Sequence, residues 1–229
     1  MYEYHFNRNK CWYKKVCDKY NGEICRPSCM RYMEMHYLMN TSGLPLNKQY
    51  KQELVPPDQD YKAFLALQEI KDNIVEFVEQ GHNLYLCSRN FGNGKTSWAV
   101  KLLQQYFDRV WAGNGFRVRG IFVHVPTFLF KIRDGITNND PEFNSLRSQL
   151  LNADLVVWDD IAATKLSDYD HANLLTYIDQ RTFSGKSNIY TGNIVDNAIF
   201  TALGNRLASR VFNESRVVEL VGLDKRGAR

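Results

Sequence analysis

No stretch of this 229-residue sequence is apolar over the about 20 consecutive residues that a membrane-spanning helix needs. The first residues, Met-Tyr-Glu-Tyr-His-Phe-Asn-Arg, also lack the apolar segment of a secretory signal peptide. No internal repeat and no low-complexity tract stands out. We therefore expect a cytoplasmic protein with no membrane partner.

The sequence also lacks a strong excess of either charge. Its net charge is +4 and its pI is near 8.7, a mildly basic balance that permits contact with nucleic acid without requiring it. The length suffices for one sizeable α/β domain and a small appendage.

The most informative segment is residues 89–97, Arg-Asn-Phe-Gly-Asn-Gly-Lys-Thr-Ser. An apolar run at 84–87 precedes it and an amphipathic helical pattern at 96–109 follows it. Strand, glycine-rich turn and helix are the context that a phosphate-binding Walker A loop requires. This context makes a chance Gly-Lys-Thr match the weaker interpretation.

Each residue type in this loop has a physical role toward a nucleotide. Gly92 and Gly94 let backbone N–H groups curl around an anion, and the helix that follows directs its positive end at the phosphates. Lys95 is expected to reach the β- and γ-phosphates, and the Thr96 hydroxyl to bind Mg²⁺. The residues expected to surround the nucleotide are Asn90, Phe91, Gly92, Asn93, Gly94, Lys95, Thr96 and Ser97.

Arg89 departs from the motif, which has a glycine at that position. That glycine eases a tight turn more than it touches phosphate. We therefore expect an altered loop entrance and an intact phosphate site.

A second part of the site follows two later strands. The apolar run 154–159 ends in Asp159 and Asp160, and acids at the carboxyl end of a buried parallel strand lie at the ligand-binding edge of the sheet. Asp159 is expected to hold Mg²⁺, and Asp160 to orient and deprotonate the attacking water. Asn193, after the strand 187–192, could contact the γ-phosphate or this water, although an Asn after a strand is more often a turn residue.

Strands and helices alternate after residue 80, which predicts a doubly wound parallel sheet. A single amphipathic helix is expected over Tyr61–Glu79. The boundaries expected for the units are an N-terminal Cys-rich domain at 1–40, a linker at 41–60 and an ATPase domain at 61–229. The further elements expected are strands at 83–88, 118–125, 154–159, 187–192 and 216–221 and helices at 96–109, 126–134, 141–152, 168–183 and 196–212.

Four of the five cysteines, Cys11, Cys17, Cys25 and Cys29, fall within 19 positions. In a reducing cytosol such clustering favours a metal over disulfides, and four thiolates could close a structural Zn²⁺ site that staples a unit too small to fold alone. His36 and His5 compete with Cys11 for the fourth position. A helix over 28–40 would put His36 about 10 Å from Cys29, which favours Cys11. Four free thiols remain the alternative.

Three arginines near the end could act on phosphate. Arg206 and Arg210 lie four residues apart on one expected helical face, and Arg226 follows the last strand. A single surface arginine usually has no such role. An oligomeric ATPase, however, needs an arginine in trans to neutralise charge at the neighbour's γ-phosphate, and a second can sense that phosphate in cis.

Together these residues resemble the AAA+ helicase loaders of bacteria and their phages, of the DnaC/DnaI type. The resemblance covers about residues 60–229. By this resemblance Lys95 and Thr96 are the Walker A residues, Asp159 and Asp160 the Walker B residues, Asn193 sensor 1, Arg210 the arginine finger and Arg226 the sensor 2 arginine.

The resemblance implies an α/β P-loop AAA+ ATPase domain without a separate lid, joined to a small helicase-binding domain that we expect to be stapled by zinc. ATP and Mg²⁺ would bind between the subunits of an oligomer, and single-stranded DNA would occupy its channel. The partner would be a replicative DNA helicase that the protein places on DNA. We hypothesise that Arg147 and Gln149, on helix 141–152, contribute to the DNA face. Because Asp160 is shorter than the Glu of many relatives, hydrolysis is expected to be slow.

Three alternatives remain from the sequence. A transposition helper ATPase of the IstB type shares the core motifs but has no reason to carry a Cys-rich N-terminal unit. A small-molecule kinase would need a substrate pocket and an arginine-rich lid, which we do not find. A non-hydrolysing scaffold that only binds nucleotide is compatible with Asp160.

Overall fold

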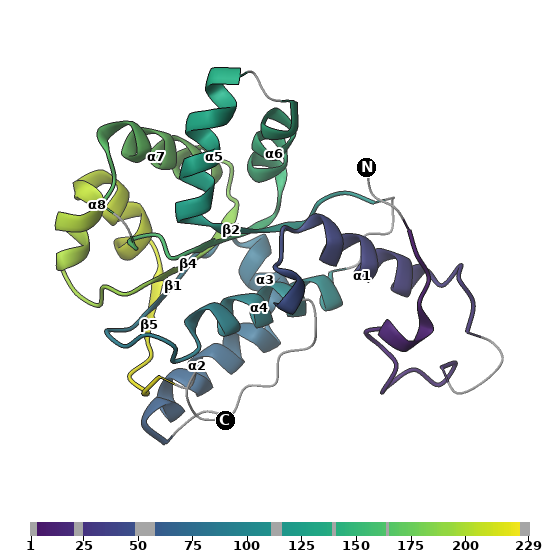
Figure 1. Cartoon of the computed structure of the whole chain (residues 1–229). Helices are drawn as coiled ribbons and strands as arrows, with labels where there is room; N and C mark the ends of the chain where they lie inside the picture. Colours follow the sequence, from purple (N-terminus) through teal and green to yellow (C-terminus); the bar gives the residue numbers. More distant parts are fainter. Residues whose placement is uncertain are drawn as a thin grey trace.

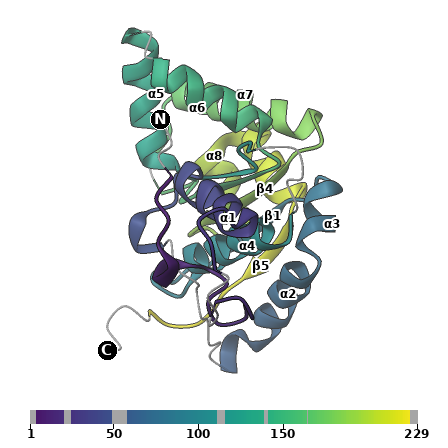
Figure 2. The same cartoon turned by 90° about the vertical axis from the view of Figure 1, so that its right-hand side faces the viewer.

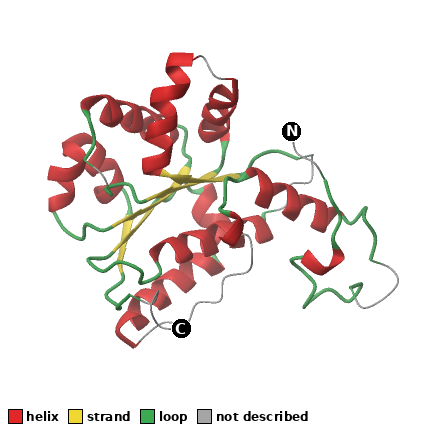
Figure 3. Cartoon of the chain, viewed as in Figure 1, coloured by secondary structure: helices red, strands yellow, loops and turns green. Residues whose placement is uncertain are grey.

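A parallel sheet of five strands, with helices on both faces, forms the body of the protein in this computed structural model (Figures 1 and 3). The structure describes residues 4–20, 25–48, 58–110, 116–138, 141–163 and 165–224. The strands are β1 (Leu84–Cys87), β2 (Gly120–His124), β3 (Leu155–Asp159), β4 (Ser187–Gly192) and β5 (Arg216–Glu219). The helices are α1 (Met30–Thr41), α2 (Tyr61–Asp72), α3 (Ile74–Glu79), α4 (Lys95–Arg109), α5 (Val125–Asn138), α6 (Pro141–Asn152), α7 (Asp168–Phe183) and α8 (Ala198–Ala208).

The strands lie in the order β2-β3-β4-β1-β5, and every pair is parallel. In the register of the sheet, Leu84 pairs with Ile189 on one side and with Arg216 on the other. The predicted α/β parallel sheet is therefore confirmed. Because all strands run the same way, the residues that follow β1, β3 and β4 meet at one edge.

Two hydrophobic cores lie on the two faces of the sheet. On β1, Leu84 and Leu86 point into the core shared with α1–α4, whereas Tyr85 and Cys87 point into the core shared with α5–α8. This alternation follows from the two-residue period of a strand. It explains why β1, buried at all four positions, reads as a continuous apolar run.

Helix α1 packs on α4 rather than standing apart from the main domain (Figures 1 and 2). Met35, Leu38 and Met39 are buried in the same core as the apolar face of α4. Immediately after α1, the carbonyl of Ser42 accepts a 2.7 Å hydrogen bond from the N–H of Phe122, on edge strand β2. The domain boundary at residue 40 remains a prediction, with α1 closely attached to the sheet and its helices.

Two expected helices differ from the structure. The single helix expected over Tyr61–Glu79 breaks at Asn73, whose side chain and backbone N–H both donate to the carbonyl of Glu69. Asn73 itself has φ −109° and ψ 26°, outside the helical region, and its side-chain amide caps the end of α2 at this carbonyl. The helix expected over 196–212 begins at Ala198, is interrupted by Gly204 at φ 70° and continues as a π-helix over Ser209–Asn213. Within the described residues, no helix is both long and apolar enough to cross a membrane.

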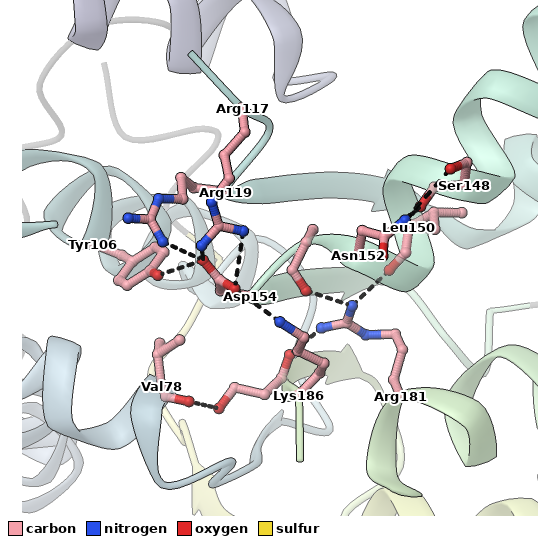
Figure 4. A network of polar contacts seen from close by, with 12 residues as sticks. Val78, Tyr106, Arg117, Arg119, Ser148, Leu150, Asn152, Asp154, Arg181 and Lys186 are labelled. Carbon is pink, nitrogen blue, oxygen red and sulfur yellow. Dashed lines mark hydrogen bonds and ion pairs between the residues drawn. The ribbon is translucent and has the colours of Figure 1, made fainter. Parts of the chain in front are cut away.

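A polar network holds the sheet at the end opposite the P-loop (Figure 4). Arg181 on α7 is fully buried and donates to the carbonyls of Leu150, Ala153 and Ser187 and to the side chain of Asn188. Burial lowers the pKa of Arg181 to about 10, so it is still a cation at neutral pH. The residue thereby ties the end of α6, α7 and the start of β4 together.

Asp154 is the acidic centre of the same network (Figure 4). Its carboxylate accepts from Tyr106, Arg117, Arg119 and Lys186 at 2.8–3.5 Å. Burial alone would raise the pKa of Asp154, but the hydrogen bonds from Lys186 and Arg119 outweigh it and hold the pKa below its usual value. The starts of β2, β3 and β4 are therefore joined by ion pairs as well as by the backbone hydrogen bonds of the sheet.

Candidate nucleotide-binding site

The loop between β1 and α4 has the backbone conformation that its glycines predict. Gly92 has φ 67° and Gly94 has φ 108°, values that residues with a Cβ rarely adopt. Gly94 is also the N-cap of α4, and its carbonyl accepts the 2.9 Å bond from Trp98 that begins the helix. The helix N-terminus thus opens into the loop, as an anion site requires.

Lys95, the first residue of α4, is held across this loop. Lys95 is buried, and its amine donates to the carbonyl of Asn90 at 2.9 Å and to Oδ1 of Asn93 at 3.4 Å. The amine therefore lies inside the curve of the loop. In this position it is close to where an anion on the helix N-terminus would bind.

Asp159 at the end of β3 lies beside Thr96. The hydroxyls of Thr96 and Thr191 each donate to Asp159 Oδ1 at 2.8 Å. Burial raises the pKa of Asp159, and the hydrogen bonds from Thr191 and Thr96 oppose that rise. A hydroxyl and a carboxylate oxygen at this separation are the donor set that Mg²⁺ prefers, so these residues fit the ion.

Asp160 has a left-handed backbone, with φ 59°, and is the one non-glycine residue in the described ranges with positive φ. Its N–H donates to the Thr191 hydroxyl at 2.9 Å, which holds this conformation. The turn directs the carboxylate into the cavity beside the loop rather than along the strand. Backbone conformations of this kind cluster at functional sites.

His124 is a site residue that the sequence did not single out. It ends β2, next to β3 in the sheet, and its Nε2 lies 3.9 Å from Asp160 Oδ2. Its other ring nitrogen is 2.8 Å from the hydroxyl of Thr127, which fixes the ring. Its position at the end of an expected strand was the available signal.

A cavity of about 640 Å³ lies over the loop. The loop residues from Phe91 to Ser97 line it together with Asp160, Asn193, Ala162, Ala163 and Lys48. Lys48, also missed by sequence reasoning, belongs to the short 3₁₀ helix Leu46–Lys48; its amine donates to the Ser97 hydroxyl at 3.3 Å and its carbonyl accepts from Gln104. Lys95, Thr96, Asp160 and Asn193 therefore face one cavity, with Asp159 directly behind Thr96.

Arg89 and the later arginines lie differently. The guanidinium of Arg89 pairs with Asp196, beyond Asn193, at 2.9 Å, and both side chains are exposed. Arg210 pairs with Asp179 on α7 at 2.7 Å and with Glu214, and it lies over the exposed ring of Phe183. Arg210 is not among the residues that line the cavity over the loop, and its role as an arginine finger stays a prediction. Arg226 lies outside the described residues.

The four N-terminal cysteines line a separate cavity of about 770 Å³. Burial raises the pKa of Cys11, and the nearby thiols of Cys25, Cys29 and Cys17 raise it further. His36 lines a different, smaller cavity. In the described part of the chain, no three His, Cys, Asp or Glu side chains are close enough to form a ready metal site. The thiols share a cavity without the geometry of a formed zinc centre.

The parallel sheet, the glycine-rich loop and the side chains gathered beside it have the arrangement of a phosphate-binding P-loop fold. No protein-family model matches the sequence, and no curated protein matches it either. Among solved structures, the chain is similar to the DnaC helicase loader, with 21% identity, a TM-score of 0.60 and coverage of 73% of this chain and 93% of that one. The similarity to DnaI gives 17% identity, a TM-score of 0.62 and coverage of 77% and 94%.

A third similar structure is the replication initiator DnaA bound to AMPPCP and single-stranded DNA. It gives 16% identity and a TM-score of 0.59 over 73% of this chain, which spans about half (48%) of that protein. The TM-scores establish a shared fold, and at these identities the likeness shows the fold alone. The resemblance to DnaC and DnaI loaders that the sequence motifs predict is therefore confirmed at the level of fold.

Proposed function

We propose that this protein is an ATP-dependent loader that binds a replicative DNA helicase and places it on single-stranded DNA. The observation that carries the proposal is the convergence of Lys95, Thr96, Asp159, Asp160 and Asn193 on one edge of a sheet with the DnaC and DnaI fold. The mildly basic charge is compatible with a DNA-binding role.

In this proposal ATP binds with its phosphates on the loop N–H groups and on Lys95. Thr96 and Asp159 would hold Mg²⁺, which supplies charge neutralisation at the β- and γ-oxygens. Asp160 accepts a proton from the water that attacks the γ-phosphorus, as the bond to ADP breaks. His124 lies close enough to Asp160 to influence how that carboxylate is directed.

The same proposal assigns Arg210 to the γ-phosphate of the ATP bound by a neighbouring subunit. It assigns Arg226 to the γ-phosphate of the ATP bound by the same subunit. The exposed Arg147 and the half-buried Gln149 on α6 are proposed to face DNA in the oligomer. A matched test substitutes Arg147→Ala and measures binding to single-stranded DNA with ATP present. Unchanged binding would remove α6 from the DNA face.

The N-terminal unit, residues 1–40, is proposed to bind the helicase. Cys11, Cys17, Cys25 and Cys29 line one cavity, and four thiolates are a suitable donor set for Zn²⁺. Elemental analysis of the purified protein tests this part separately: about one zinc per chain is expected, and metal-free folded protein would overturn it.

The function as a whole is tested by mixing the protein with a replicative helicase, with and without ATP, and imaging the particles by negative stain. A loader is expected to form an ATP-dependent complex with the helicase ring and to load it on single-stranded DNA. A protein that binds ATP but neither the helicase nor DNA would contradict the proposal.

One alternative has a specific observation in its favour. Asp160 carries a shorter acid than Glu, so the chain could act as a scaffold that binds ATP without hydrolysing it. Turnover measured with ATP alone, with DNA and with helicase separates the two. Binding with no turnover in any combination would support the scaffold.

A further inference from the structure

The chain beyond β5 leaves the sheet and lies along the phosphate loop. We name Leu220–Gly222 the C-terminal brace. All six backbone polar groups of the brace are hydrogen-bonded. The N–H of Leu220 donates to the carbonyl of Cys87 at 2.9 Å, and the N–H groups of Val221 and Gly222 donate to Asp60 at 2.7–3.2 Å.

The three carbonyls of the brace are bound by the phosphate loop itself. Nδ2 of Asn93 donates to the carbonyl of Leu220 at 2.9 Å. Nδ2 of Asn90 donates to the carbonyls of Val221 and Gly222 at 3.0 and 3.2 Å. Two side chains at variable positions of the motif are therefore committed to one distant segment.

The same two asparagines also contact the phosphate-binding lysine. Oδ1 of Asn93 and the carbonyl of Asn90 accept from the amine of Lys95. Asn93 is buried, and its amide also donates to the hydroxyl of Ser88 at 2.5 Å. A continuous chain of contacts thus runs from Asp60 through the brace and the two asparagines to Lys95.

Asp224, two residues beyond the brace, also lies directly over the loop. A Cβ on Gly92 would lie 1.7 Å from Oδ1 of Asp224, so the side chain of Asp224 occupies the space that only a glycine leaves. Gly92 therefore serves two purposes here: it permits φ 67° and it admits Asp224.

We propose that the C-terminal brace holds the phosphate loop in its binding shape, with Asp60, Asn90 and Asn93 as positioning residues for Lys95 and the loop N–H groups. The inference rests on the nucleotide binding proposed above. A loop with two positive-φ glycines has many conformations when unsupported, and fixing it beforehand lowers the entropy lost on binding. By linkage, nucleotide must then stabilise the docked brace by the same factor.

The first test uses the unmodified protein. Hydrogen exchange of the amides of Leu220, Val221 and Gly222 is measured with and without Mg²⁺ and a non-hydrolysable ATP analogue. Slower exchange with nucleotide is expected. Equal or faster exchange, with binding of the analogue demonstrated, would overturn the brace.

The second test alters the brace without touching the loop. Asp60→Ala removes the carboxylate that holds two brace amides, and ATP affinity by calorimetry is expected to fall on the order of tenfold. In steady state KM should rise while kcat at saturating ATP stays nearly constant, a split that general loss of folded protein would not produce. Glu69→Ala is the control, because Glu69 lies on α2, the helix that Asp60 directly precedes, and pairs instead with Arg216 on β5.

Asn90→Ala supplies a second variant should Asp60→Ala fold poorly. It removes the side chain that binds the brace and keeps the backbone carbonyl that Lys95 contacts. Wild-type ATP affinity in either folded variant would overturn the brace and leave the proposed function standing. Failure of the wild-type protein itself to bind ATP would instead contradict the proposed function, and the brace with it.

Discussion

The hydroxyl of Thr96 donates to Oδ1 of Asp159 across 2.8 Å, joining the start of α4 to the end of β3. Adjacent oxygen ligands of an octahedral Mg²⁺ are separated by about 2.9 Å, since each lies 2.0–2.1 Å from the ion. The two oxygens that the proposal assigns to Mg²⁺ therefore already have the spacing of neighbouring ligands. Thr191 holds the same carboxylate oxygen from the other side.

Removal of the Thr96 hydroxyl should weaken this pair. Thr96→Val preserves shape and loses one hydrogen bond to a carboxylate, worth about 1.5–3 kcal/mol. We expect Mg²⁺-dependent ATP turnover to fall about 10- to 100-fold, measured across a Mg²⁺ titration. Thr96→Ser is the control and should retain most activity. Equal turnover in the Val variant would remove Thr96 from the metal site.

Asp160→Asn should separate binding from hydrolysis. Asn tolerates the left-handed conformation that Asp160 adopts at φ 59°, so folding should be preserved. Loss of the proposed general base is expected to lower turnover by about 10²–10⁴-fold with ATP affinity near that of the wild type. Single-turnover hydrolysis and calorimetry measure the two quantities. Normal hydrolysis in this variant would assign the base to another group.

Arg210 should act between subunits. Lys95→Ala and Arg210→Ala proteins are each expected to be inactive alone. A mixture should recover ATP turnover, because some sites then combine an intact Lys95 with an intact Arg210 from the neighbour. The ion pairs of Arg210 with Asp179 and Glu214 must rearrange for this role, so Asp179→Asn is an informative companion variant. No recovery at any mixing ratio would argue for a role within one subunit.

Arg181 should be essential for stability and irrelevant to nucleotide chemistry. Arg181→Met removes the donors of four buried hydrogen bonds, and of their acceptors Oδ1 of Asn188 still accepts from Trp158. We expect the free energy of unfolding to fall by about 3–5 kcal/mol, measured by urea denaturation. Exposed Arg147→Met is the matched control and should change little. A stable Arg181→Met protein would show that water or rearrangement satisfies these carbonyls.

Asp154 should make a contribution to the free energy of unfolding whose dependence on pH has a known sign. Its pKa is lowered in the folded state, so its stabilisation is present above its ordinary pKa of about 4 and is lost as the pH falls through the lower folded value. Asp154→Asn should therefore destabilise the protein at pH 7 by about 2 kcal/mol. The difference from wild type should shrink as the pH falls below about 4. A difference independent of pH would point to packing rather than charge.

Most of the fold was predictable because its signals are local. The buried run at Leu84–Cys87 and the Gly-Lys-Thr sequence at 94–96 mark a strand and a helix start by period and residue type alone. The break at Asn73 was missed because the apolar period continues across it, while the break itself is a change in the backbone angles of that single residue.

The remainder of the site depends on contacts between distant parts of the chain. His124 reaches Asp160 only because β2 and β3 are neighbours in the sheet. Lys48 reaches Ser97 from outside the main domain's expected boundary. Nothing in the local sequence of Asn90 and Asn93 indicates that their amides bind Val221 and Leu220, more than 120 positions later. A single sequence carries no pairing signal for such contacts.

The packing of α1 against α4 has a mechanical consequence. Helix α4 begins with Lys95 and Thr96, and its apolar face shares one interior with Met35 and Leu38 of α1. Closely packed interiors transmit displacement rather than absorb it. A protein that bound α1 and displaced it would therefore also displace α4, which carries Lys95 and Thr96. Binding of a partner at α1 and the proposed binding of phosphate at the loop would then be coupled.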